Sequence, residues 1–205
     1  MNINPLKSID FTQVLGEKKL ELRMCGLTPY QLIGIQKGIQ YGHTNDQYAA
    51  HMIEFIMNWT IDLNVRKQHY KYAEKSEESL YTYLDWLVNW KTYIILNGGT
   101  TNTNPERLGT LNKHLQTLRD NGVFCTEFYE PDLGDQLTSV NFLVDERVFL
   151  RDKYPDFQFQ LKQTDILNPN FICDDEKNDW ETWVESIGGK KNLFLRSFLS
   201  NFKLA

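Results

Sequence analysis

The chain has 205 residues, of which 41% are hydrophobic and 24% are charged, and its formal net charge is −5. This composition is typical of a globular protein and excludes the disordered and fibrous classes. No apolar run approaches the ~20 residues that a transmembrane helix needs, so no membrane partner is expected. The sequence also lacks the basic excess with which tRNA- and DNA-binding proteins usually neutralise phosphates.

Metal and cofactor chemistry finds little support in the residue pattern. The cysteines, Cys25, Cys125 and Cys173, lie far apart without a C-x-x-C pair, which favours reduced thiols in a cytoplasm over a zinc site. The first ten residues contain no apolar signal segment, so a cytoplasmic location is expected. The histidine spacing predicts no metal, and without a G-x-S-x-G motif or a cysteine beside a histidine, no covalent catalysis and no cofactor are expected.

The first predicted strand is residues 19–24 (KLELRM), where polar and apolar residues alternate as in a half-buried strand. A helix is predicted to begin directly after it, because Thr28 suits the capping position and Pro29 the first helical position. Helical spacing of apolar residues continues to about Met57.

Two patterns mark the first half of this helix. Glycines recur at every fourth residue, and such a smooth ridge predicts close packing on the sheet. The polar residues Lys37, Gln40 and His43 recur at every third residue, which predicts that Lys37 and Gln40 face a pocket while His43 lies at its rim or against the sheet. The glycines of the ridge are Gly34, Gly38 and Gly42.

The remaining elements follow in the order helix, strand, helix, strand, loop, strand. The helix before residue 91 has an apolar face of Leu80, Tyr83, Leu84 and Leu87. The next helix is bounded by Asn104, Pro105 and Gly122, and the glycine- and threonine-rich loop before it is an alternative anion site, although it lacks both phosphate-binding glycine motifs. The predicted strands are residues 19–24, 91–96, 123–129 and 139–144.

These elements predict an α/β domain of residues 1–149, with a mixed four-stranded sheet and helices on both faces. Residues 150–205 are predicted to form a helical C-terminal extension, whose last apolar helical face is expected to dock either on the core or on a partner. A homodimer is one such partnership. The face consists of Leu195, Phe198, Leu199 and Phe202.

Four local patterns and their order resemble the type II peptidyl-tRNA hydrolase family, in a form associated with bacteriophage-encoded proteins. The strand LELRM ends near an arginine, and GIQKGIQYGHT stands where the family has a helix reading G-K-x-A-A-Q-x-x-H-A. YLDWLVNWKTYIILN is similar to a tryptophan-containing helix and a lysine-led strand, and FYEPDLGDQLTSVNFLV to the region around a D-A-G-x-T loop. The resemblance spans roughly residues 19–149, no motif matches in full, and the extension has no counterpart in the cellular enzymes.

The resemblance implies site residues position by position. Gln40 and His43 match the glutamine and histidine of the family's helix, while Asp132 matches the loop aspartate and Thr138 the threonine that opens the exit strand. Asp132 and Thr138 are expected to be catalytic, Asp132 as the base or water-orienting group and Thr138 as a hydrogen-bond donor, with Gln40 and His43 as binding residues.

The lysine of the family's helix is displaced in this chain. The family places it four residues before the glutamine, where this chain has Gln36, and Lys37 follows one position later. Lys37 is expected to act as the catalytic cation, with Gln36 as a binding residue and Asp132 near Lys37, directly or through one water.

Two functions stay open from the sequence. In the first, the protein hydrolyses an acyl or peptidyl ester on a tRNA end or on a related nucleotide conjugate, with a cation and a carboxylate beside the ester. In the second, it is a non-catalytic phage accessory protein in the host cytoplasm that captures a small nucleotide, such as a host-defence signal, or a host protein.

Overall fold

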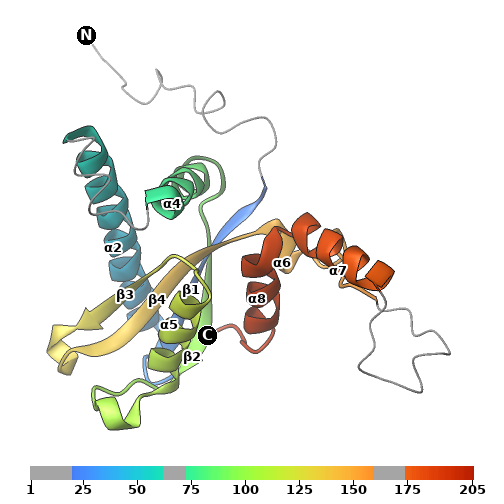
Figure 1. Ribbon diagram of the computed structural model, residues 1–205. Helices are drawn as coiled ribbons and strands as arrows, with labels where there is room; N and C mark the ends of the chain where they lie inside the picture. Colours follow the sequence, from blue (N-terminus) through green and yellow to red (C-terminus); the bar gives the residue numbers. More distant parts are fainter. Residues whose placement is uncertain (1–19, 62–72, 159–173) are drawn as a thin grey trace. The chain divides into compact units, whose positions relative to one another are not determined.

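The computed structural model describes residues 20–61, 73–158 and 174–205, and everything below concerns these residues. They form two compact units (Figure 1). The first contains the residues up to Val144 together with Phe202–Ala205, and the second contains Asp145–Asn201. No helix in the described ranges is both long enough and apolar enough to cross a bilayer.

The first unit is built on one four-stranded sheet with the order β2-β1-β4-β3. Strands β1 and β2 run parallel, whereas β3 and β4 form an antiparallel hairpin, so the predicted mixed sheet is confirmed. The strands are β1 (Leu22–Pro29), β2 (Thr92–Gly99), β3 (Cys125–Glu130) and β4 (Gln136–Asp145).

The predicted helix start at Thr28 is wrong. Both Thr28 and Pro29 belong to β1, where they pair with Asn97 and Gly99 of β2, and the register shifts between them. Proline has no backbone N–H to donate and fits a strand end as well as a first helical turn, so pairing with β2 decides the outcome. Helix α2 (Gly34–Ile61) begins five residues later.

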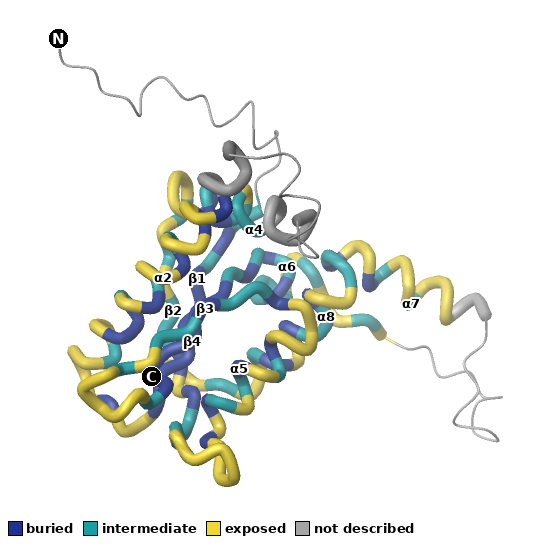
Figure 2. The backbone as a smooth tube through the Cα atoms, turned by 60° about the vertical axis from the view of Figure 1, so that its left-hand side comes forward, coloured by how far each residue is buried: buried dark blue, intermediate teal, exposed yellow. Residues whose placement is uncertain are grey.

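Helix α2 packs on the sheet through a face that differs from the apolar spacing in the sequence. The isoleucines of its first five turns point away from the sheet, with Ile35 80% and Ile39 49% exposed. The side that packs on the sheet carries aromatic and polar residues instead, and Figure 2 shows buried and exposed stretches alternating along α2. Its buried residues are Gln40, Tyr41, Thr44, Tyr48, Met52 and Phe55.

The predicted packing of the glycine ridge on the sheet is also wrong. A Cβ atom added at Gly34, Gly38 or Gly42 would meet no atom within 4 Å. The close approach occurs at Gly26 of β1, where the Tyr41 ring lies against the strand and the Tyr41 hydroxyl donates a hydrogen bond to the Met24 carbonyl at 2.9 Å.

An aromatic core fills the space beneath α2 and α4 (Ala73–Asp85). Tyr48 stacks on Tyr83 with ring centroids 5.0 Å apart, and Trp86 is fully buried. Helix α4 continues into a π-helical turn (Trp86–Trp90), which shifts Leu87 away from the predicted apolar face and leaves it 40% exposed. Burial raises the pKa of the Tyr48 hydroxyl.

Helix α5 (Thr110–Asp120) packs on the opposite face of the sheet from α2. Met24 of β1 lies in the core beneath α2. Leu27 lies three residues further along the strand, so its side chain points to the other face of the sheet. There it lies near Leu111 of α5, beside Gly98. Apolar side chains of β1 point to both faces of the sheet, and a helix covers each face, as predicted.

The chain end returns to the first unit as an added edge segment. Leu204 forms an antiparallel bridge with Leu96, and the Ala205 amide donates to the Ile95 carbonyl at 3.0 Å. Phe202 lies beyond the helix on which it was predicted, and its ring meets His114 of α5 edge-on at 4.9 Å. Burial lowers the pKa of His114, which favours the neutral ring at this contact.

The second unit contains α6 (Glu146–Phe149), α7 (Asp174–Ser186) and α8 (Gly189–Leu199). Gly188, which precedes α8, and Gly189, its first residue, both adopt positive φ angles, so the chain turns between α7 and α8 at two glycines. Leu195 and Phe198 of the predicted apolar face are buried.

Two glycine-to-alanine substitutions should shift stability in opposite directions. A Cβ atom at Gly26 would overlap the Tyr41 ring and lie 2.7 Å from Asn141 Oδ1, so Gly26→Ala should destabilise the protein by ~1–3 kcal/mol. Gly38→Ala adds a methyl group in open space on a helix and should stabilise it by ~0.5–1 kcal/mol. Urea unfolding of both variants checks this, and a destabilising Gly38→Ala would contradict the described environment of α2.

Candidate functional site

A connected set of polar side chains lies where α2 meets the β3–β4 hairpin, and Gln40 is its centre. The Thr138 hydroxyl of β4 donates to Gln40 Oε1 at 2.6 Å, and Gln40 Nε2 donates to the Glu130 carboxylate at 2.5 Å. Gln40 is 7% exposed and Thr138 is 1% exposed. Both ends of the Gln40 amide are therefore held, which fixes the orientation of this side chain.

Two more threonines fix the backbone around Gln40. Thr44, one turn later on α2, donates its hydroxyl proton to the Gln40 carbonyl at 2.9 Å. Thr126 of β3 donates to the Thr44 carbonyl at 3.1 Å, and Thr138 also contacts the Phe128 carbonyl at 3.2 Å. These bonds tie one turn of α2 to both strands of the hairpin, so Gln40 stands on a rigid support.

Lys37 lies on the side of α2 that packs on the sheet, one turn before Gln40 and Tyr41. It is half-buried, whereas Gln36 beside it is exposed. Helix α2 is α-helical from Gly34 onward, so each residue turns the side-chain direction by ~100° and places Lys37 close to the direction of Thr44 and Tyr48. The displaced lysine thus occupies the sheet-facing side of the helix without local over- or underwinding.

The other expected site residues lie around this centre. His43 is exposed and stacks on Phe128 of β3 with ring centroids 4.9 Å apart. The Gln36 side chain accepts a weak hydrogen bond from the Ile33 amide at 3.4 Å, near the start of α2. This role is local to the first turn.

The loop between β3 and β4 contains Asp132 in a single turn, Pro131–Leu133, where it is exposed. Among the described residues, neither Lys37 nor Asp132 takes part in an ion pair, so the structure does not join them directly. Glu130, two residues before Asp132, is the carboxylate that contacts Gln40.

Glu130 is the site residue that the sequence did not reveal. It lies at the end of β3, immediately before Pro131. Pro131 indicates the end of the strand. Glu130 is the last residue of β3 and pairs with Gln136 of β4. No motif distinguishes it from Asp132 in the same loop.

The alternative anion site in the loop after β2 is not favoured by the structure. Its backbone amides are already used, since the Thr100 amide donates to Thr110 Oγ1 at 2.7 Å and the Thr110 amide to Thr100 Oγ1 at 3.1 Å. The amides of Asn102, Asn104 and Glu106 likewise donate to asparagine side chains. An anion would have to compete with these internal acceptors.

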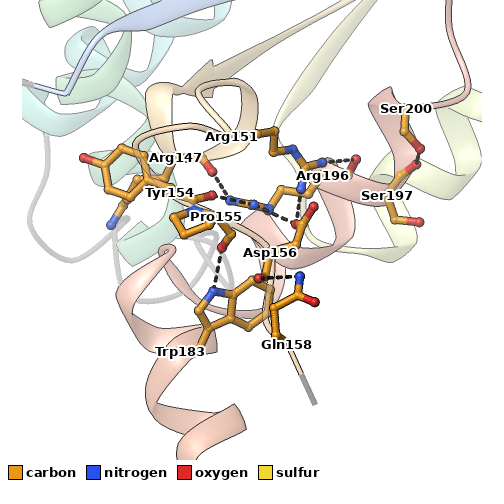
Figure 3. A network of polar contacts seen from close by, with 10 residues as sticks. All are labelled: Arg147, Arg151, Tyr154, Pro155, Asp156, Gln158, Trp183, Arg196, Ser197 and Ser200. Carbon is orange, nitrogen blue, oxygen red and sulfur yellow. Dashed lines mark hydrogen bonds and ion pairs between the residues drawn. The ribbon is translucent and has the colours of Figure 1, made fainter. Parts of the chain in front are cut away.

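A second polar network lies within the C-terminal unit, centred on Arg196 of α8 (Figure 3). The Arg196 guanidinium donates to the carbonyls of Arg147 and Tyr154 at 2.6 and 2.7 Å, and to Asp156 Oδ1 at 2.7 Å. Hydrogen bonds from Arg196 and the charges of Arg196 and Arg151 lower the pKa of the Asp156 carboxyl. Its partners within the unit make Arg196 a structural residue.

The comparisons with known proteins add no relative. No family model, no curated protein and no solved structure matches this chain. The fold and the site define an α/β protein with a mixed four-stranded sheet and a glutamine–threonine–glutamate cluster between α2 and the β3–β4 hairpin, in which the glutamine and the threonine are buried.

Proposed function

We propose that this protein is a phage-encoded relative of the type II peptidyl-tRNA hydrolases, and that it hydrolyses an acyl or peptidyl ester on a tRNA end or on a related nucleotide conjugate. One observation carries the proposal. Gln40 and Thr138, the two buried residues that the resemblance selects, lie 98 positions apart in the sequence and share a direct hydrogen bond of 2.6 Å.

The chemistry assigned to the site is attack of a water molecule on the ester carbonyl carbon. A carboxylate takes a proton from the water, the Lys37 ammonium stabilises the developing oxyanion, and the bond to the ribose oxygen breaks as that oxygen gains a proton. Gln40 and Thr138 orient the substrate. Asp132 is the carboxylate implied by the resemblance, and Glu130 is the carboxylate that contacts Gln40, so Asp132→Asn and Glu130→Gln distinguish the two assignments.

A second function, capture of a small nucleotide without chemistry, is favoured by a different observation. Both ends of the Gln40 amide already have protein partners, and Lys37 has no carboxylate beside it among the described ion pairs. A cation without a paired base can hold a phosphate but does not activate water. In this alternative Lys37 binds the ligand's phosphate.

Turnover of an N-acetylated aminoacyl-tRNA tests the first function. Lys37→Ala should slow release of the acyl amino acid by at least ~100-fold, since it removes the cation from the oxyanion. Lys113→Ala, at an exposed position of α5, is the matched control and should leave the rate unchanged. Release by the wild-type protein no faster than spontaneous ester hydrolysis would exclude hydrolysis of this ester and leave nucleotide capture, detectable by mass spectrometry of co-purifying small molecules.

A further inference from the structure

The hydroxyl group of Thr28 is a buried polar group that has no partner in the described part of the chain. Thr28 is 0% exposed, and its Oγ1 atom forms no hydrogen bond with any described residue. A buried hydroxyl without a partner costs stability, and nearly all buried polar groups of native proteins are paired, so this exception calls for a physical explanation. Other buried hydroxyls beneath α2 do donate hydrogen bonds, namely those of Thr44, Thr126, Thr138 and Ser139.

The side chain of Thr28 points to the face of the sheet that α2 covers. A Cβ atom added at Gly26 would meet the Tyr41 ring of α2, so this position of β1 faces the helix. Side chains alternate along a strand, and Thr28, two residues after Gly26, therefore points to the same face. Leu27, between them, lies on the α5 face beside Gly98.

Lys37 is the residue of α2 that lies level with Thr28. Helix α2 runs antiparallel to β1, because the chain turns back within four residues after the strand and the core contacts of α2 continue toward the start of the strand. Two strand residues span ~6.6 Å and four helical residues span about 6 Å. The step from Gly26 to Thr28 therefore matches the step from Tyr41 back to Lys37, and residues four apart lie on the same side of a helix.

The first turn of α2 and the Lys37 ammonium group make this place suited to an anion. Lys37 is half-buried and forms no ion pair among the described residues. The first turn contains no acidic residue, and the amides that open a helix lack intrahelical acceptors and form the positive end of its dipole. The Glu130 carboxylate is held by Gln40, three residues further along α2. A cation, a hydroxyl donor and helix amides together form a donor set that suits phosphate.

We propose that the Thr28 hydroxyl and the Lys37 ammonium group form a subsite for one phosphate group of the ligand, with the hydroxyl donating to a phosphate oxygen. This subsite rests on the second proposed function, in which Lys37 binds the ligand's phosphate, and adds Thr28 as a further binding residue. Because Thr28 is fully buried, a phosphate reaches it only when neighbouring side chains move, and the flexible four-carbon stem of Lys37 allows such a movement.

Thr28→Val tests whether the hydroxyl lacks a partner in the protein itself. Valine keeps the branched shape of threonine and suits a strand, so the fold should be retained. In a buffer without phosphate, the urea midpoint should be higher for Thr28→Val than for the wild type, because the variant removes an unpaired buried hydroxyl. Thr117→Val is the matched control on α5, where the hydroxyl donates to the Lys113 carbonyl at 2.8 Å, and it should not raise the midpoint.

Isothermal titration with inorganic phosphate then tests the subsite. The wild type should bind phosphate, and Thr28→Val and Lys37→Ala should each raise the dissociation constant by at least ~10-fold, since each removes a charge-assisted contact. Thr117→Val should bind phosphate as the wild type does.

Three results would overturn the subsite. A lower urea midpoint for Thr28→Val would show that the hydroxyl is already paired, for example with a buried water. An unchanged phosphate affinity in Thr28→Val, with a weakened one in Lys37→Ala, would exclude Thr28 and leave Lys37 as the phosphate-binding residue. A wild-type protein that binds no phosphate would exclude the subsite and this role of Lys37 together, whereas ester hydrolysis is decided separately by the turnover assay.

Discussion

Replacing Arg196 with methionine should lower the free energy of unfolding of the C-terminal unit by about 2–4 kcal/mol. Arg196 is 2% exposed and donates to two backbone carbonyls as well as to Asp156. Methionine fills a similar volume but leaves the Arg147 and Tyr154 carbonyls without donors, at ~1–3 kcal/mol for each buried group. Asp156 adds less, because its side chain is 59% exposed.

Tryptophan fluorescence during urea unfolding includes a signal from this unit, since Trp183 of α7 lies under the Arg196 guanidinium and donates to the Pro155 carbonyl at 3.0 Å. Lys190→Met, at an exposed lysine on the same helix, is the control and should change stability by less than ~0.5 kcal/mol. An Arg196→Met variant as stable as the Lys190→Met control would show that the network in Figure 3 contributes no net stability.

Gln40→Leu should lower the hydrolytic activity at least ~100-fold and destabilise the fold by about 1–2 kcal/mol. Leucine keeps the packing between α2 and the hairpin but leaves Glu130 and Thr138 without their shared partner. Gln47→Leu is the matched control on the same helix. Gln47 is exposed and has no expected role in the site, so its replacement should affect neither property by a comparable amount.

A double-mutant cycle with Thr138→Val separates structure from function at this site. If the 2.6 Å hydrogen bond is formed in solution, the stability losses of Gln40→Leu and Thr138→Val should be non-additive by roughly 1 kcal/mol. Additive losses would mean that the two residues do not interact. This stability measurement stays informative if the protein proves to bind a nucleotide without hydrolysis.

The sheet could be predicted from the sequence because each strand carries a local signal. Alternation in KLELRM and an apolar run ended by Gly98 and Gly99 identify β1 and β2 whatever surrounds them. The start of α2 could not be predicted in this way. Thr28 and Pro29 suit either a helix start or a strand end. Pairing with β2 decides between them, and the partner of Thr28 in β2, Asn97, lies 69 residues later in the sequence.

The orientation of α2 shows a second limit of periodicity. Spacing alone predicts that isoleucines face a core, yet Ile35, Ile39 and Ile53 are exposed and Tyr41 and Tyr48 are buried. The aromatic side chains reach across to β1 and α4, which smaller aliphatic residues would fill less well. Which of two apolar faces is buried depends on the shape of the opposing surface.

Some residues of the candidate site could likewise be predicted from the sequence, and others could not. Gln40 and Thr138 were identified through the order of motifs, and the structure brings them into contact. The partner carboxylate was not identifiable, because Glu130 and Asp132 lie two residues apart around one proline and only the end of β3 determines which one reaches the Gln40 amide. The direct Lys37–Asp132 pair is not formed, and its water-mediated form stays a prediction.

The central claim is that Gln40, Lys37 and Thr138 together recognise an acylated nucleotide end, and nuclear magnetic resonance tests it most directly. The side-chain amide signal of Gln40, assigned by its loss in Gln40→Leu, is followed while an N-acetyl-aminoacyl adenosine is added. We predict a saturable shift of the Gln40 signal that is abolished in Lys37→Ala. An unmoved Gln40 signal at saturating ligand, or shifts confined to the loop after β2, would contradict the account.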